Sequence, residues 1–188
     1  MKRYIIVLAP AFAGLVFGTG LGAIVVKPAQ AQSAPSSEAT SKPQMPEIPG
    51  EETVNVYAQR NDNAGAAPFT GPEMMKAFHG TEGIDRIVDS LVDRVRLDAR
   101  TSEVFHASDF VRLRRTLKEQ FCYILGGGCA YSGRDMVSVH KDYGVATVEF
   151  NALVEDLQDA MNAEGVGFGA QNRLLAKLAP MKRVVVLR

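Results

Sequence analysis

The stretch Gly126–His140, GGGCAYSGRDMVSVH, decides the fold that the rest of the sequence implies. Its three glycines end a helix, because glycine readily adopts the left-handed conformation that closes helices. After a loop, a short amphipathic segment follows and ends at Gly144. Its apolar face consists of Met136, Val139, His140 and Tyr143. The stretch therefore predicts a sharp break between two helices, followed by a histidine on an apolar helix face.

Apolar residues on both sides of this stretch recur with helical spacing. They predict helices over residues 84–95, 110–124, 148–161 and 174–181, and Asp109 is a candidate cap for the second of these. The apolar stripes include Ile84, Ile87, Val88, Leu91, Val92 and Val95, then Phe110, Leu113, Leu117, Phe121 and Ile124, then Phe150, Leu153 and Leu157, then Leu174 and Leu178. The only strand candidate is the run 184–187, which could instead extend the last helix or form a contact patch. We therefore expect an all-α domain of about 110 residues.

The chain has three histidines, and only His140 falls within an apolar stripe. Taken alone, a neutral imidazole in such a place is more often a satisfied core residue than a metal ligand. However, the helix expected opposite offers it Leu113 and Leu117 but no polar partner on its apolar face. One imidazole facing an apolar wall suits a haem, whose iron accepts one protein nitrogen while the macrocycle is buried against aliphatic and aromatic groups.

Several short motifs follow one another between residues 77 and 181, and no additional segment interrupts their spacing between Ile84 and Pro180. They are Phe78-His79-Gly80-Thr81-Glu82-Gly83-Ile84, Val104-Phe105, Gly126-Gly127, Tyr131-Ser132-Gly133-Arg134-Asp135-Met136, Val139-His140 and Leu178-Ala179-Pro180. In this order and spacing they resemble the group I truncated haemoglobins, compact globins built as a two-over-two helical sandwich that encloses haem. The resemblance implies a truncated globin domain over residues 71–188 that holds one haem b.

Carried over residue by residue, the resemblance makes His140 the proximal iron ligand. It makes Phe105 the aromatic side chain that packs against the haem near the bend after the second helix. The implied haem contacts are Phe105, Leu113, Leu117, Phe121, Tyr131, Met136, Val145, Phe150 and Leu153. Arg115, Arg134 and Lys141 either pair with haem propionates or are ordinary solvated charges.

The distal side departs from the family. Group I members usually carry a tyrosine and a glutamine above the iron, and the corresponding positions here are Val92 and Leu117, with Leu113 at the remaining distal position. A charge-assisted hydrogen bond to bound dioxygen is worth roughly 1.5–3 kcal/mol, so its loss predicts fast oxygen release and relatively favoured CO or NO binding. His106 or Tyr123 could supply a donor only if the helices pack differently from those of the family.

The resemblance implies a haem protein that reversibly binds O2, NO or CO, and the N-terminal residues predict that this protein is exported. Two alternatives keep the haem: an NO dioxygenase, which the missing distal pair disfavours, and a redox or peroxidase-like protein. A third is a globin fold without haem that serves as an interaction module. The NO dioxygenase would also need an external reductase as a partner, because the chain encodes no flavin or nicotinamide domain. The formal net charge is zero, so the chain lacks the excess of basic residues that is typical of nucleic-acid-binding proteins.

The first 31 residues predict a secretory signal peptide or an N-terminal membrane anchor. Lys2 and Arg3 precede an uncharged run over residues 4–26, and Ala29-Gln30-Ala31 forms a small-x-small cleavage motif. A run of about 20 apolar residues is also long enough to span a bilayer. We therefore expect the rest of the chain to be exported to the periplasm or tethered to the outer face of the inner membrane. Residues 32–70, rich in proline and polar side chains, predict a disordered linker.

Two cysteines, Cys122 and Cys129, flank the triple glycine. Export would place them in an oxidising compartment, where a disulfide between them would restrain the link between the distal helix and the helix that carries His140. The sequence favours this pairing but does not give the separation of the two Cα atoms.

Overall fold

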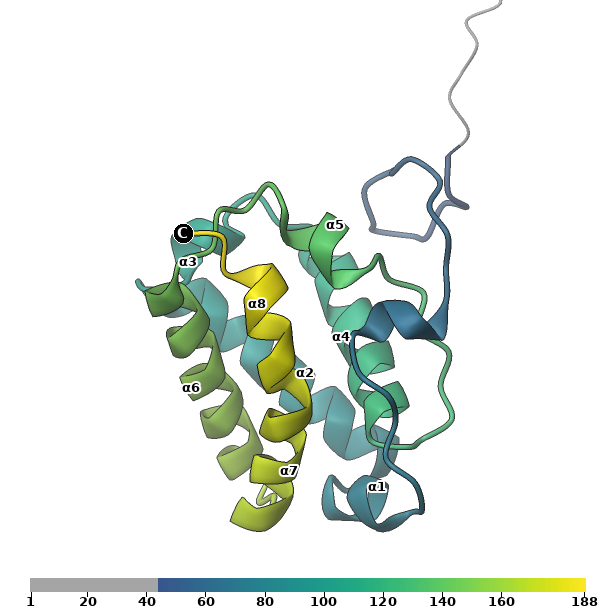
Figure 1. Ribbon diagram of the computed structural model, residues 1–188, viewed down its shortest axis with the longest axis vertical. Helices are drawn as coiled ribbons and strands as arrows, with labels where there is room; N and C mark the ends of the chain where they lie inside the picture. Colours follow the sequence, from purple (N-terminus) through teal and green to yellow (C-terminus); the bar gives the residue numbers. More distant parts are fainter. Residues whose placement is uncertain (1–43) are drawn as a thin grey trace, which may run out of the picture. The chain divides into compact units, whose positions relative to one another are not determined.

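The computed structural model describes residues 44–188, which form helices joined by short loops (Figure 1). The helices are α1 (Glu73–Ala77), α2 (Gly80–Leu97), α3 (Ser102–Phe105), α4 (Phe110–Ile124), α5 (Met136–His140), α6 (Thr147–Ala163), α7 (Phe168–Leu178) and α8 (Lys182–Val185), with 3-10 turns η1 (Asn61–Ala64) and η2 (Ala179–Met181). Within the described part of the chain, the only β pairing is a single bridge between Gln44 and Asn55. The all-α prediction is confirmed.

Helix α2 is the centre of the packing. Its predicted apolar stripe is at most 3% exposed, and each such side chain contributes about 1.5–3 kcal/mol relative to an exposed one. The stripe contacts both α4 and α6. In Figure 1, α6 and the rod formed by α7 and α8 lie in front of α2. Two pairs of helices are therefore stacked on one another, α2 with α4 and α6 with α7–α8.

Helix α4 begins where the sequence predicts. The Asp109 side chain accepts hydrogen bonds from the backbone N–H groups of Val111 (3.1 Å) and Arg112 (3.0 Å), as an N-terminal cap does. The helix ends before the glycines, and Gly126 adopts a φ of +86°. A Cβ atom on Gly126 would lie 2.6 Å from the carbonyl oxygen of Phe69, so glycine is required there both for its backbone angle and for space.

A disulfide joins the last turn of α4 to the loop that follows it. Cys122 and Cys129 are bonded, and their Cα atoms lie 5.7 Å apart. This separation lies in the ordinary range for a disulfide. The bond spans the glycine-rich break and restrains the chain on its way to α5.

The first half of the C-terminal run that was a strand candidate, Val184 and Val185, is helical, whereas Val186 and Leu187 lie beyond the end of the helix. Residues 182–185 form α8, which packs against α5. After the helix, the backbone N–H of Leu187 donates a hydrogen bond to the carbonyl oxygen of Val145 (2.9 Å). The run thus both extends the helical rod and forms a contact, and α8 lies beside the helix that carries His140.

In the structure, residues 44–70, the described part of the expected linker, belong to the same compact unit as the helices. Asn63 and Ala64 are buried, and the Glu51 side chain is only 2% exposed. The Asn63 amide donates to the carbonyl oxygens of Ala58 (2.8 Å) and Gly133 (3.1 Å). The segment has too few apolar residues to build a core of its own, but its polar groups find specific partners on the helical domain.

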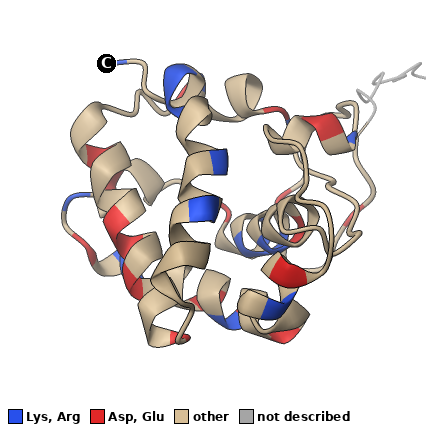
Figure 2. Ribbon diagram, turned by 60° about the horizontal axis from the view of Figure 1, so that its bottom comes forward, with Lys and Arg blue, Asp and Glu red and all other residues tan. Residues whose placement is uncertain are grey.

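The predicted signal peptide or anchor (residues 1–31) and the start of the predicted linker (residues 32–43) lie outside the described residues. Among residues 44–188, no helix is both long and apolar enough to cross a membrane. Acidic and basic side chains are interspersed over the helices, as Figure 2 shows, rather than gathered on one basic face.

Candidate functional site

Two adjoining cavities meet at His140. One has a volume of about 330 Å³ and is lined by several charged side chains, namely Glu52, Asp109, Arg112, Arg134, Asp142 and Glu149; we call it the charged cavity. The other, of about 540 Å³, has Glu155 as its one charged lining residue; we call it the apolar cavity. Four residues line both cavities: His140, Phe150, Leu153 and Val185. Together the cavities form a slot between α4 on one side and α5, α6 and α8 on the other.

The imidazole of His140 is oriented by its own helix. Asp135 caps α5 by accepting a hydrogen bond from the backbone N–H of Ser138 (3.0 Å), which fixes the start of the helix. At the other end, Nδ1 of His140 lies 2.7 Å from the carbonyl oxygen of Met136. A carbonyl can only accept, so Nδ1 carries the proton and Nε2 keeps its lone pair free for a metal. Burial lowers the pKa of His140, which keeps the ring neutral at pH 7.

The residues expected to contact haem all lie in the walls of the two cavities. Phe105, Leu113, Tyr131 and Val145 line the charged cavity, and Leu117, Phe121 and Met136 line the apolar cavity, while Phe150 and Leu153 line both. Most of these side chains are only half-buried although they belong to or pack against the main hydrophobic core. Their exposed parts face the slot.

This lining fits a porphyrin. A haem is an apolar disc with two carboxylates on one edge, and it needs one neutral nitrogen donor, an apolar slot and a polar opening. The slot offers the free Nε2 of His140, aliphatic and aromatic walls, and charged side chains confined largely to one of its two parts. Within residues 44–188, no cluster of three or more histidine, cysteine, aspartate or glutamate side chains could hold a metal ion without such a cofactor.

The expected distal residues are brought together only in part. Leu113 and Leu117 lie one turn apart on α4 and face the charged and the apolar cavity, respectively. Val92 lies fully buried in the core and lines neither cavity; its neighbour Leu91 lines the apolar cavity instead. Leu91 rather than Val92 reaches the cavity wall because α2 is rotated so that its apolar stripe is buried. Both of these residues are apolar.

Three polar side chains of α4, Arg112, Thr116 and Gln120, also line the slot, and each donates hydrogen bonds within the protein. Arg112 donates to Glu51 (3.0 Å) and to the carbonyl oxygen of Glu52. The Thr116 hydroxyl donates to the carbonyl oxygen of Arg112 (2.9 Å). The Gln120 amide donates to the carbonyl oxygen of Ala64 (2.8 Å), and its nitrogen lies 3.6 Å from the sulfur of Met136. His106 and Tyr123, considered as alternative donors, line neither cavity. Gln120 was missed by the sequence analysis, although a polar residue next to Phe121 in an apolar stripe is a visible signal.

The three candidate partners of the propionates have different surroundings. Arg115 forms ion pairs with Glu51 (2.5 Å) and Glu119 (2.8 Å) and lines neither cavity, so it is engaged elsewhere. Lys141 is 64% exposed and lines neither cavity. Arg134 lines the charged cavity, and no carboxylate of the described residues pairs with it. Of these three residues, Arg134 is thus the one that lines a cavity.

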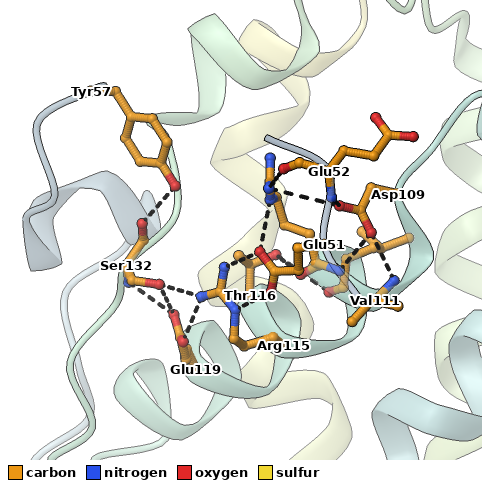
Figure 3. Close-up of polar contacts among 11 residues, drawn as sticks. Glu51, Glu52, Tyr57, Asp109, Val111, Arg115, Thr116, Glu119 and Ser132 are labelled. Carbon is orange, nitrogen blue, oxygen red and sulfur yellow. Dashed lines mark hydrogen bonds and ion pairs between the residues drawn. The ribbon is translucent and has the colours of Figure 1, made fainter. Parts of the chain in front are cut away.

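The sequence analysis also missed a set of side chains from residues 51–57. Glu52, Val54 and Tyr57 line the charged cavity, and Glu51 anchors the segment to α4, as Figure 3 shows. The available signal was Tyr57, the one aromatic residue of this segment, together with the two valines Val54 and Val56. Glu51 gave none, because its partners lie more than 60 residues further along the chain.

Comparison with known proteins adds independent information. Residues 74–186 match the sequence pattern of the bacterial-like globin family. The chain is 30% identical over 102 residues to a group 1 truncated hemoglobin of Mycolicibacterium paratuberculosis, an alignment that covers 54% of this chain and 75% of that protein. It is 26% identical over 107 residues to a group 1 truncated hemoglobin of a Nostoc species, covering 57% and 91% of the two chains.

Solved structures show the same architecture. The truncated hemoglobin of Tetrahymena pyriformis in its Fe(III) form aligns with a TM-score of 0.58 at 19% identity, covering 60% of this chain and 97% of that one. The 2/2 hemoglobin of a Synechococcus species, solved in the cyanomet state with covalently attached heme, aligns with a TM-score of 0.56 at 21% identity, covering 61% and 98%. The expected two-over-two fold is confirmed.

Proposed function

Because the chain belongs to the bacterial-like globin family, as a group 1 truncated haemoglobin, we propose that it holds one haem b and reversibly binds diatomic gases at the haem iron. The observation that carries this proposal is the position of His140, whose free Nε2 faces a slot between two adjoining cavities. If His140 were a core histidine without a ligand, the apolar side chains around it would be fully buried. Most of them are instead half-buried.

When bound, the haem would supply the iron that binds the gas. His140 would hold that iron through Nε2, and the bond from its Nδ1 to the Met136 carbonyl holds the ring in place and makes Nε2 a better donor. Phe150 and Leu153 lie against the same part of the slot and exclude water from it. An external reductase would keep the iron in the ferrous state that binds gases.

The apolar distal side sets the order of the gas affinities. Leu113 and Leu117 offer no hydrogen bond donor, and the donors of Thr116 and Gln120 are engaged. Dioxygen depends on a distal donor more than CO or NO does, because it is the more polar of these ligands when bound. We therefore expect fast oxygen dissociation and relatively strong binding of CO and NO.

The charges around the slot give the cofactor an orientation. The charged cavity contains Arg112, which is paired with Glu51, and Arg134, whereas the apolar cavity offers no cation. Ionised propionates are costly to bury without a positive partner. The propionate edge of the haem should therefore face the charged cavity, with Arg134 as its partner.

The absorption spectrum tests this function. The purified protein mixed with hemin should develop a Soret band, and the reduced form should shift it on addition of CO. His140→Ala should lose most of the band, whereas the matched control His106→Ala, at an exposed histidine that lines neither cavity, should keep it. A wild-type chain that stays colourless, or a full band in His140→Ala, would contradict the proposal.

We also propose that the protein is exported, with residues 1–31 as a signal peptide or an anchor at the outer face of the inner membrane. The Cys122–Cys129 disulfide supports this, because disulfides persist in oxidising compartments. Cell fractionation of the full chain beside a variant lacking residues 2–31 would test it. Equal distribution of the two between cytoplasm and periplasm would refute export.

A further inference from the structure

A segment that precedes the family match forms part of the wall of the charged cavity. We call residues Glu51–Tyr57 the strap; the match to the globin family begins only at residue 74. Every third strap residue, Glu51, Val54 and Tyr57, is partly buried, whereas the residues between them are exposed. Val54 and Tyr57 line the charged cavity together with Glu52. The globin helices therefore do not enclose this cavity alone.

One end of the strap is anchored on α4. The Glu51 carboxylate, 2% exposed, receives Nε (2.5 Å) and Nη2 (2.9 Å) of Arg115 and Nε of Arg112 (3.0 Å), as Figure 3 shows. The two arginines lower the pKa of Glu51 and keep it ionised. Beside it, the backbone N–H of Glu52 donates to Asp109 (2.8 Å), and Arg112 donates to the carbonyl oxygen of Glu52. A buried carboxylate between two guanidinium groups tolerates little displacement, so this end is fixed.

The other end of the strap is held by the loop that leads to α5. The Tyr57 hydroxyl donates a hydrogen bond to the carbonyl oxygen of Ser132 (3.0 Å). The guanidinium of Arg134 lies 5.2 Å from the centre of the Tyr57 ring, a cation–π distance. The strap therefore runs from the distal helix α4 to the segment that precedes His140, and it joins the two sides of the slot at the charged cavity.

We propose that the strap is part of the haem-binding site: Val54 and Tyr57 cover the propionate edge of the haem and slow its loss. This inference rests on the proposed function, since it needs a haem in the slot. Two observations carry it: the strap side chains line the cavity that holds the charged groups, and the strap is fixed at both ends. The Tyr57 ring also holds Arg134 beside that cavity, which makes Tyr57 a positioning residue for the propionate partner.

Hemin transfer to excess apomyoglobin tests the proposal on the full chain. Tyr57→Ala removes the ring from the cavity wall and should raise the rate of hemin loss about tenfold, the factor that corresponds to 1.4 kcal/mol. Tyr57→Phe keeps the ring and its contact with Arg134 but loses the bond to Ser132, so its rate should rise less than that of Tyr57→Ala. The matched control is Glu164→Gln, which weakens ion pairs to His79 and Arg86 at a site that lines neither cavity. It should lower stability without changing hemin loss.

A second measurement needs no substitution. Amide hydrogen exchange over residues 51–58 of the wild-type chain should slow when hemin is added, because the strap would then pack against the cofactor. Hemin loss from Tyr57→Ala at the wild-type rate, or unchanged exchange over the strap, would overturn the proposal. Either result would leave the haem function intact as long as the wild-type Soret band depends on His140. A colourless wild type would instead refute the haem function itself.

Discussion

Substituting Leu117 by glutamine would place a further hydrogen bond donor in the wall of the apolar cavity. Leu117 lies one helical turn after Leu113, and the neighbouring donors of Thr116 and Gln120 are already bonded to backbone carbonyls at 2.9 and 2.8 Å. The new amide would therefore add to this cavity a donor that is not already bonded to the backbone.

The size of the effect follows from the bond that is gained. A hydrogen bond to a ligand with partial negative charge is worth roughly 1.5–3 kcal/mol. At about 1.4 kcal/mol for each factor of ten, the oxygen dissociation rate should fall between tenfold and a hundredfold. The CO dissociation rate should change much less, because bound CO is less polar. Burying an amide without its ligand should destabilise the unliganded protein by about 1–3 kcal/mol.

Stopped-flow replacement of oxygen by CO, on the reduced protein, measures the dissociation rate directly. Leu117→Met is the matched control, since it keeps a similar volume and adds no donor, and it should release oxygen at nearly the wild-type rate. If Leu117→Gln also releases oxygen within twofold of the wild type, the reasoning is refuted. Either a donor from another element already reaches the ligand, or residue 117 does not lie above the iron.

Two further predictions concern stability. Replacing Cys122 and Cys129 by serine opens a loop with a sequence separation of 7, which should lower the free energy of unfolding by about 2.4 kcal/mol in thermal or denaturant unfolding, and the reduced wild type should match the variant. Hydrogen bonds from Arg86 and then His79 hold the pKa of Glu164 at about 2, below its usual 4.5, so its contribution is present above about pH 4.5 and is lost as the pH falls toward 2. The difference in unfolding free energy between the wild type and Glu164→Gln should therefore shrink over that interval, and a difference that stays constant down to pH 2 would contradict the assignment.

The local features of the fold could be predicted because they depend on near neighbours along the chain. The apolar spacing of α2 and α4 and the cap at Asp109 require only residues within one or two helical turns. The position of His140 on an apolar face follows from the same periodicity. The resemblance of the chain's motifs to those of globins then predicted the residues that would contact haem. The structure places all nine of these expected haem contacts in the walls of the two cavities.

The rest of the site depends on pairs that are distant in sequence. Residues 44–70 have the composition of a linker, and only the partners of Glu51 on α4, 61 and 64 residues away, show why this segment is held. The same ion pairs remove Arg115 from the candidates for propionate binding. Composition and periodicity carry no information about such partners, because a polar side chain is as compatible with solvent as with a buried cation.

Local patterns in the chain are enough to predict the amphipathic helices, the points at which they end, and the position of one histidine on an apolar face. These are consequences of side-chain periodicity and of glycine's backbone freedom, both of which act over a few residues. That Leu91 rather than Val92 faces the slot, and that Val54 and Tyr57 help to enclose it, follows only from the packing of the folded chain. Which side chains line a cavity depends on how each helix is rotated in the core and on which distant segment covers it, and packing fixes both only when the whole chain has folded.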